Sequence, residues 1–350
     1  MRPKVLVVAT SRKTRGGITS VIKAHEQGAQ WREFRCHWVQ THRDGPAWRK
    51  IAYFAAGLTD FLLRLPFYDI VHIHTADHST EKRKRIFARL SKLFGKKLLV
   101  HLHSSGPEFS ISGQYRNLYT YSFNNADRII LLSKSWQQEA LKAFDIDANR
   151  TVVLYNPCPV VEPSDARNRE KYILFAGTLT HRKGYDDLIR AFAKIADKFP
   201  DWKLKLAGNG EVDNGRRLAH ELGIERQVEF LGWVNGERKD KAFRNASIYC
   251  LPSYSEGFPM GVLDAWAYHL PVVTTPVGGI TDVGIDGENM LLFEPGDVEA
   301  LARQLERLIT DKDLYRKIEA ASARFAQETF NLDTITHRLA DIYRSLLCEF

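Results

Sequence analysis

Residues 253–266, SYSEGFPMGVLDAW, carry two carboxylates, Glu256 and Asp264, eight positions apart. Two acids that work as one acid/base pair, as in a retaining glycoside hydrolase, lie roughly 5 Å apart. Eight residues of continuous helix rise about 12 Å, which is too wide for two acids that act on one bond. The spacing therefore predicts that the two acids hold different parts of one long ligand.

The chain around this stretch alternates short apolar runs with helical patterns. The runs are almost continuously apolar, which is typical of parallel strands that are buried on both faces. Such an alternation predicts doubly wound α/β sheets. The strand-like runs lie at residues 4–10, 69–75, 97–103, 128–133 and 151–156, and then at 172–177, 202–208, 228–233, 246–253, 271–275 and 290–296.

The chain is long enough for two domains, because 350 residues exceed the usual size of one hydrophobic core. Residues 156–171, NPCPVVEPSDARNREK, hold three prolines and no clear hydrophobic period, and we interpret them as the linker. We place the first domain at 1–160, the second at 161–330, and a terminal helix at 331–350, where apolar residues recur at helical spacing.

The cysteines and the apolar runs favour a reduced, cytoplasmic protein. Successive cysteines are more than ninety residues apart, so no close pair can form a zinc site or a redox dithiol. The N-terminal run MRPKVLVVAT is interpreted as a strand, because no small-residue cleavage site follows it. No apolar run approaches the roughly 18 residues of a membrane-spanning helix.

Positive charge is concentrated in the first half of the chain: residues 1–168 carry a net charge of +12 and residues 169–350 one of −4. A predicted helix at 82–97 places four cations on one face beside an apolar stripe, and an amphipathic segment at 51–67 precedes it. Two interpretations remain open. Both helices pack on the first sheet and expose cations to solvent, or this half docks on anionic lipid. The cations are Arg85, Arg89, Lys92 and Lys96, and the stripe is Ile86, Leu90 and Leu93.

Ligands of doubly wound sheets bind beyond the carboxyl ends of the strands, so the loops that follow the strands carry the chemistry. Gly16 and Gly17 follow the first strand and precede a helix, where backbone amides and the helix dipole can face an anion. A turn that merely connects strand and helix is the alternative. The stretch is neither a P-loop, because Gly-Lys-Ser/Thr is absent, nor a Gly-x-Gly-x-x-Gly dinucleotide motif.

Two pairs of alternating histidines, His72 with His74 and His101 with His103, end two of the predicted strands. We expect His101 and His103 to point to opposite faces, with His103 nearer the ligand-binding end of the sheet. A hydrogen-bonded core histidine is the alternative, and it suits His101 better than His103. The pairs have no carboxylate partner at a spacing diagnostic of a metal site, so we expect no metal.

In the second half, Arg182 and Lys183 lie just before Gly184 and a strongly amphipathic helix. A solvated pair of loop cations is the alternative interpretation. In a doubly wound sheet the loop at 256–261 would face them, and there Pro259 suits a first helical turn while glycines expose backbone amides. Cations and a helix N-terminus together predict a diphosphate site that needs no metal.

Residues 256–279, EGFPMGVLDAWAYHLPVVTTPVGG, resemble the signature of the family 4 glycosyltransferases. The segments RGG at 15–17, HLHSSG at 101–106, GTLTHRKG at 177–184 and LAGNGE at 206–211 follow that family's order, so the resemblance spans nearly the entire chain. It implies the GT-B fold: two Rossmann-like domains that face each other across a cleft, with the C-terminal helix returning to the first. It also implies transfer of a sugar from a nucleotide diphosphate, usually with retention and without a metal.

The resemblance also implies roles for individual residues. Glu256 would hold hydroxyls of the donor sugar, Asp264 would hold the ribose hydroxyls, and His103 would lie near the reacting sugar. Glu256 and His103 are therefore the candidate catalytic residues. The residues implied at the donor diphosphate are Gly16, Gly17, Arg182 and Lys183, and those of the donor-sugar loop are Gly257, Phe258, Pro259 and Met260.

Four positions can be compared with the family pattern, and three of them depart from it. Thr178 stands where the family usually has a phosphate-binding arginine, and Arg182 is the candidate replacement. Lys183 matches the family lysine. Asp264 and Asp282 stand where the family usually has glutamate, and Asp264 is one methylene shorter than the residue it replaces.

The resulting hypothesis is a retaining, metal-independent glycosyltransferase that uses a UDP or GDP sugar and needs no further cofactor. Its acceptor would be a glycan, lipid-linked, in polysaccharide or glycoconjugate synthesis at the inner face of the plasma membrane. A sugar-nucleotide epimerase of similar fold is one alternative, and a phosphorylase would need a cofactor lysine that we cannot place. A basic protein that binds lipid or nucleic acid is another, although no nucleic-acid module appears and no aromatics are interleaved with the cations.

Overall fold

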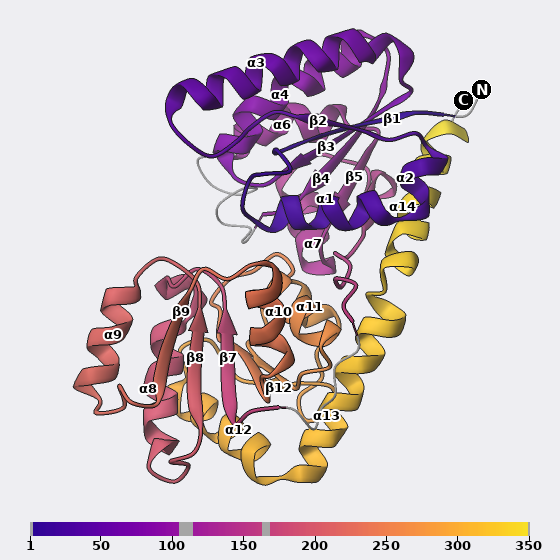
Figure 1. Cartoon of the computed structure of the whole chain (residues 1–350). Helices are drawn as coiled ribbons and strands as arrows, with labels where there is room; N and C mark the ends of the chain where they lie inside the picture. Colours follow the sequence, from indigo (N-terminus) through magenta and orange to yellow (C-terminus); the bar gives the residue numbers. More distant parts are fainter. Residues whose placement is uncertain (1–2, 105–114, 163–168, 349–350) are drawn as a thin grey trace. The chain divides into compact units, whose positions relative to one another are not determined.

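The computed structural model describes residues 3–104, 115–162 and 169–348, and the chain forms two compact units (Figure 1). Unit 1 comprises residues 1–157 with 332–350, and unit 2 comprises residues 158–331. Each unit has one six-stranded sheet whose paired strands are all parallel. The predicted α/β class is therefore confirmed.

Unit 1 has the strand order β2-β1-β3-β4-β5-β6. The chain moves outward from β1 to β2 and returns to place β3 on the other side of β1. Its strands are β1 (Val5–Ala9), β2 (His37–Gln40), β3 (Ile70–Thr75), β4 (Lys97–Leu102), β5 (Arg128–Leu131) and β6 (Thr151–Val153).

Helices cover both faces of this sheet, and a separate apolar core lies on each face. One core joins the sheet to α3, α4, α6 and α7 through side chains such as Phe61 and Phe87. The other joins it to α1, α2 and α14, and includes Ile335, Leu339 and Tyr343 of the terminal helix. The helices are α1 (Gly17–Gln27), α2 (Ala29–Glu33), α3 (Ala47–Arg64), α4 (His78–Leu93), α6 (Arg116–Asn125), α7 (Lys134–Ala143) and α14 (Leu332–Cys348), with short turns η1 (Leu65–Phe67) and η3 (Ala148–Arg150).

Unit 2 has the strand order β12-β11-β10-β7-β8-β9. The chain moves outward from β7 and returns beside β7 as β10, so the carboxyl ends of β7 and β10 form a switch point, where such sheets bind ligands. The strands are β7 (Tyr172–Ala176), β8 (Lys203–Ala207), β9 (Val228–Gly232), β10 (Ile248–Leu251), β11 (Val272–Thr274) and β12 (Leu291–Leu292). The helices are α8 (Tyr185–Ala196), α9 (Val212–Glu221), α10 (Gly236–Arg244), α11 (Met260–Ala267), α12 (Val298–Thr310) and α13 (Lys312–Arg324), with η5 (His181–Lys183), η6 (Gly278–Asp282) and the π-helical turn η7 (Phe325–Thr329).

The cysteines are reduced and the helices are short or polar. All four cysteines are free thiols, and Cys158 and Cys250 are buried. Across the three described ranges, every helix is too short or too polar to cross a bilayer.

Candidate active site

Two loops meet at the switch point of unit 2, one after β7 and one after β10. Gly184 has a φ of +68°, and a Cβ added there would collide with the backbone carbonyl of Pro252. The Tyr254 amide donates to the Arg182 carbonyl at 2.8 Å, and Nη1 of Arg182 donates to the Ser255 carbonyl at 2.6 Å. These contacts hold the loop that carries Arg182 and Lys183 against the start of the loop at 256–261, called the EGFPMG loop below.

Lys183 and Glu256 form an ion pair between these two loops. The Glu256 side chain is 6% exposed and that of Lys183 is 18% exposed. The Ser253 hydroxyl also donates to Oε1 of Glu256 at 2.7 Å. The structure thus brings the lysine predicted for the diphosphate into direct contact with the acid predicted for the donor sugar, a contact that the sequence analysis did not predict.

The EGFPMG loop leads into α11, whose first residue is Met260. Pro259 is the N-cap residue of α11 and precedes the first turn, so it lies one position earlier than the sequence suggested. Phe258 is 4% exposed, and its ring packs on Trp266 and Phe330 at centroid distances of 6.1 and 5.1 Å. Phe258 therefore anchors the loop in an aromatic core, and its side chain is not available to a ligand.

The Gly-Gly turn at Gly278 and Gly279 packs against the same loop. The Gly279 amide donates to the Gly257 carbonyl at 2.7 Å. Gly278 has a φ of +55°, and an added Cβ there would collide with the Glu256 carbonyl. A Cβ on Gly279 would collide with the ring of Phe258. In the sequence these glycines are only part of a signature, whereas in the structure they let two loops pack without side chains between them.

Asp264 lies on α11, and its partner comes from α10. Nζ of Lys239 is 2.7 Å from Oδ1 of Asp264, whose side chain is 11% exposed. Burial raises the pKa of Asp264, and the neighbouring ammonium group of Lys239 opposes that shift. Sequence reasoning missed Lys239, and the only available signal was the basic composition of α10. A ribose held by Asp264 would share this carboxylate with Lys239.

Unit 1 presents an open helix N-terminus after β1. Gly16 is the N-cap residue of α1, with a φ of +133° that favours glycine, and Gly17 is the first helical residue. Both are exposed, and no heavy atom lies within 4 Å of a Cβ built on Gly16. Exposed helix N-termini can bind anions, and the anion site at Gly16 and Gly17 remains a prediction.

The expectation that His101 and His103 point to opposite faces was wrong. Side chains two positions apart on a strand lie on the same face. The ring centroids of His101 and His103 are 4.0 Å apart, and those of His72 and His74 are 4.2 Å apart. His103 follows the end of β4, where its amide donates to the Thr75 carbonyl at 2.7 Å and its Nε2 lies 2.8 Å from Nδ1 of His74. Burial lowers the pKa of His103 to about 3, so its imidazole is neutral.

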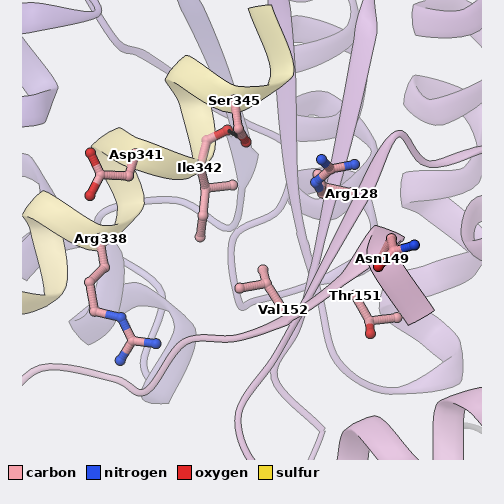
Figure 2. A pocket seen from close by; sticks show the side chains of 8 residues that line it. All are labelled: Arg128, Asn149, Thr151, Val152, Arg338, Asp341, Ile342 and Ser345. Carbon is pink, nitrogen blue, oxygen red and sulfur yellow. Dashed lines mark hydrogen bonds between the residues drawn. The ribbon is translucent and has the colours of Figure 1, made fainter. Parts of the chain in front are cut away.

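A separate pocket of about 370 Å³ lies in unit 1 (Figure 2). Arg128 and Thr151 are the first residues of β5 and β6, so the pocket is at the amino ends of these strands. Ligands of doubly wound sheets bind at the opposite ends, so the pocket is distinct from the predicted sites. Its lining consists of Arg128, Asn149, Thr151, Val152, Arg338, Asp341, Ile342 and Ser345.

Comparison with known families defines the class. Residues 161–325 match the family described as glycosyl transferases group 1, and residues 4–157 match the glycosyl transferase 4-like domain. The chain belongs to the family 4-like glycosyltransferases and has the GT-B fold.

Individual relatives agree with this assignment. An uncharacterized glycosyltransferase of Methanocaldococcus jannaschii is 27% identical over 81% of this chain and 77% of its own length. The lipopolysaccharide core biosynthesis glycosyltransferase LpsE of Rhizobium meliloti is 29% identical over 69% and 70%. An uncharacterized glycosyltransferase of Haemophilus influenzae is 32% identical, but the match spans only 59% of its length. Among solved structures, Anabaena HepE in complex with UDP-glucose has a TM-score of 0.78 at 20% identity, over 98% of this chain and 99% of that one.

Proposed function

We propose that the protein transfers a sugar from a nucleoside diphosphate sugar to a glycan acceptor, with retention and without a metal at the donor diphosphate. The observation that carries the proposal is the contact of Lys183 with Glu256 at the switch point of unit 2. UDP is the favoured nucleotide, because the solved HepE structure of similar fold holds UDP-glucose. The other predicted residues are proposed to contact the sugar nucleotide during the same reaction.

Charge neutralisation is the main task of the proposed donor site. As the glycosidic bond breaks, negative charge grows on the leaving diphosphate, and preorganised donors stabilise it. Lys183, Arg182 and the amides at the start of α11 supply positive charge in unit 2. In unit 1, the exposed N-terminus of α1 at Gly16 and Gly17 could likewise bind a phosphate group.

The carboxylates and His103 would position the sugar nucleotide. The Glu256 carboxylate pairs with Lys183 and accepts a hydrogen bond from Ser253, so it suits hydroxyls of the donor sugar. Asp264 suits the ribose hydroxyls in the same way. His103, neutral at physiological pH, suits a hydrogen bond to the reacting sugar rather than a charge on it.

A thermal-shift panel of UDP, GDP and ADP sugars tests the donor proposal. A ligand at 100 times its Kd adds about 2.7 kcal/mol of stability. We expect a UDP sugar to stabilise the protein and Lys183→Ala to remove the effect. Lys198→Ala is the matched control, because Lys198 forms an exposed pair with Glu306 in the same unit. Failure of every nucleotide sugar to stabilise the wild type would contradict the proposal.

We further propose that the acceptor is lipid-linked and that unit 1 docks on an anionic membrane surface at the inner face of the plasma membrane. The evidence begins with α4, which packs on the sheet through Phe87 and Ala88 but also exposes apolar side chains. Ile86 is 41% exposed and Leu93 is 79% exposed, whereas Glu81 and Lys84 are buried. The predicted apolar stripe therefore faces solvent at its two ends, whereas Leu90 between them packs against the core. Packing on the sheet alone does not account for the exposed ends.

The neighbouring helix α3 shows the same feature. It is anchored on the sheet side through Phe61, yet Trp48 is 67% exposed, Ile51 68% and Leu63 70%. Phe67, in the turn that follows, is 69% exposed. Apolar side chains beside cations are typical of helices that lie in a membrane interface. The assigned role of LpsE in lipopolysaccharide core synthesis supports an acceptor of this kind.

Co-sedimentation with vesicles tests the docking. Basic residues near an anionic surface contribute about 1 kcal/mol each, so we expect binding to anionic vesicles that weakens in high salt. Leu63→Gln and Leu93→Gln should each reduce binding. Ile285→Gln is the control, because Ile285 is 53% exposed in unit 2. Equal binding to neutral vesicles, or binding insensitive to salt, would favour a soluble acceptor.

A further inference from the structure

Five histidines gather on one face of the sheet in unit 1. His72 and His74 come from β3, His101 from β4, and His103 follows β4; His74 and His101 are register partners. His25 comes from α1, which covers this face. Ring centroids of neighbouring members are 4.0–6.5 Å apart.

These imidazoles are buried but poorly satisfied. His25, His72, His74 and His101 are each at most 2% exposed. Within the described parts of the chain, Nε2 of His25, His72 and His74 and both ring nitrogens of His101 have no hydrogen-bond partner. Buried polar groups are nearly always paired, so five unpaired nitrogens in one cluster need an explanation.

Two hydrogen bonds fix the rings of His72 and His74 and so determine where the lone pairs on their Nε2 atoms point. Nδ1 of His72 is 2.8 Å from the Tyr343 hydroxyl, and Nδ1 of His74 is 2.8 Å from Nε2 of His103. When each Nδ1 carries the proton and donates it, the opposite Nε2 presents an unused lone pair to the cluster. Metal-binding histidines are held in the same way, with the second ring nitrogen donating to a neighbouring acceptor.

We propose that unit 1 contains a transition-metal site of the zinc class, formed by His72, His74 and His101, with His25 as the fourth ligand. The three core ligands each offer one ring nitrogen, and these atoms lie within 4.8 Å of one another. Zinc–nitrogen bonds of about 2.0–2.1 Å require nitrogens roughly 3.4 Å apart in a tetrahedron, so the rings draw together when the metal binds. Imidazole sets of this kind suit zinc, copper and nickel.

The electrostatics agree with this geometry. Burial lowers the pKa of His72, His74 and His101 well below the ordinary value, and lowers that of His25 to about 4. Neutral imidazoles bind a metal without first losing a proton. The bound metal would also fix the orientation of His103 through His74. The proposed site would have a structural role, and its test needs no activity measurement.

The test uses the full chain after treatment with a chelator. Titration with Co²⁺ should give the visible spectrum of a tetrahedral ion at one equivalent per chain, and Zn²⁺ should displace it. His101→Leu should weaken Co²⁺ binding at least 100-fold. Tyr343→Phe keeps the ring but removes the acceptor from His72, and should weaken binding about 10- to 100-fold. His220→Gln, at an exposed position in unit 2, should leave binding unchanged.

Circular dichroism of the metal-free variants establishes that they are folded before binding is compared. If His101→Leu does not fold, Tyr343→Phe decides the question, because it changes only one hydroxyl. Absence of a tetrahedral Co²⁺ spectrum in the wild type would overturn the proposal. So would wild-type Co²⁺ affinity in each folded variant, since the metal would then bind elsewhere.

Discussion

The ion pair between Lys183 and Glu256 can be tested with a double-mutant cycle in Lys183→Met and Glu256→Gln. The carboxylate is 6% exposed and the ammonium group 18% exposed, so the two charges interact mostly out of water. Removing the lysine leaves the Glu256 charge buried beside the Ser253 hydroxyl. Breaking a buried pair in this way costs about 3–5 kcal/mol. Because Lys183 retains some access to solvent, we expect about 3 kcal/mol for Lys183→Met and about 1 kcal/mol for Glu256→Gln.

The double variant should lose less stability than the sum of these two effects. Groups in direct contact show interaction energies of about 0.5–3 kcal/mol, and for this pair we expect about 2 kcal/mol. Lys198 and Glu306 provide the control cycle, because they form the same chemical pair at 2.9 Å with side chains 60% and 35% exposed. Exposed pairs contribute about 0–1 kcal/mol.

Urea unfolding followed by circular dichroism measures both cycles. An interaction energy for Lys183 and Glu256 no larger than that of the control pair would refute the reasoning. It would mean that the two side chains do not share a buried contact in solution. The proposed donor site would then lose the observation on which it rests, whereas a large interaction energy would establish that the site is assembled before any ligand binds.

Three further predictions address the same unit. Gly279→Ala should destabilise the protein by about 1–3 kcal/mol in thermal unfolding and weaken UDP binding, because the added methyl group collides with the ring of Phe258; an unchanged melting temperature would contradict this. Burial raises the pKa of Asp264, so its carboxylate is protonated at a higher pH than an ordinary aspartate. UDP affinity measured by calorimetry should therefore fall as the pH is lowered through that range, and Asp264→Asn should remove the dependence. Arg182→Ala should lower transfer or donor hydrolysis about 10²- to 10³-fold, and an unchanged rate would show that Arg182 does not replace the missing family arginine.

The fold class could be predicted because its determinants are local. Strands buried on both faces read as continuous apolar runs, and such runs marked the observed strands except β2 (His37–Gln40), which was missed. The order of the strands was not predicted, because β10 pairs with β7 and not with β9, which precedes it in the chain. Such a choice depends on packing between segments far apart in sequence.

Contacts within the candidate site could be anticipated where a loop follows a strand and not where two packed elements meet. Arg182, Lys183 and Glu256 lie in loops that follow strands, and the structure brings these loops together as the sequence suggested. The contact of Lys239 with Asp264 was not anticipated, because it depends on how α10 packs beside α11. The histidine faces were misassigned for a different reason. Residues two positions apart on a strand were assigned to opposite faces, although they lie on the same face. Applied correctly, this rule places His101 and His103 together from the sequence alone.

In helix α4, the apolar stripe found in the sequence does not face the core along its whole length. An apolar stripe normally faces the core, yet Leu93 is exposed while Lys84 and Glu81 are buried. Burial raises the pKa of Glu81 to about 7 and lowers that of Lys84, so it costs free energy to hold these two groups in their charged forms. Departures from local rules are expected at functional sites. Because α3 also exposes apolar side chains, an apolar partner that covers these residues would offset part of the cost, and the vesicle experiment measures whether a membrane is that partner.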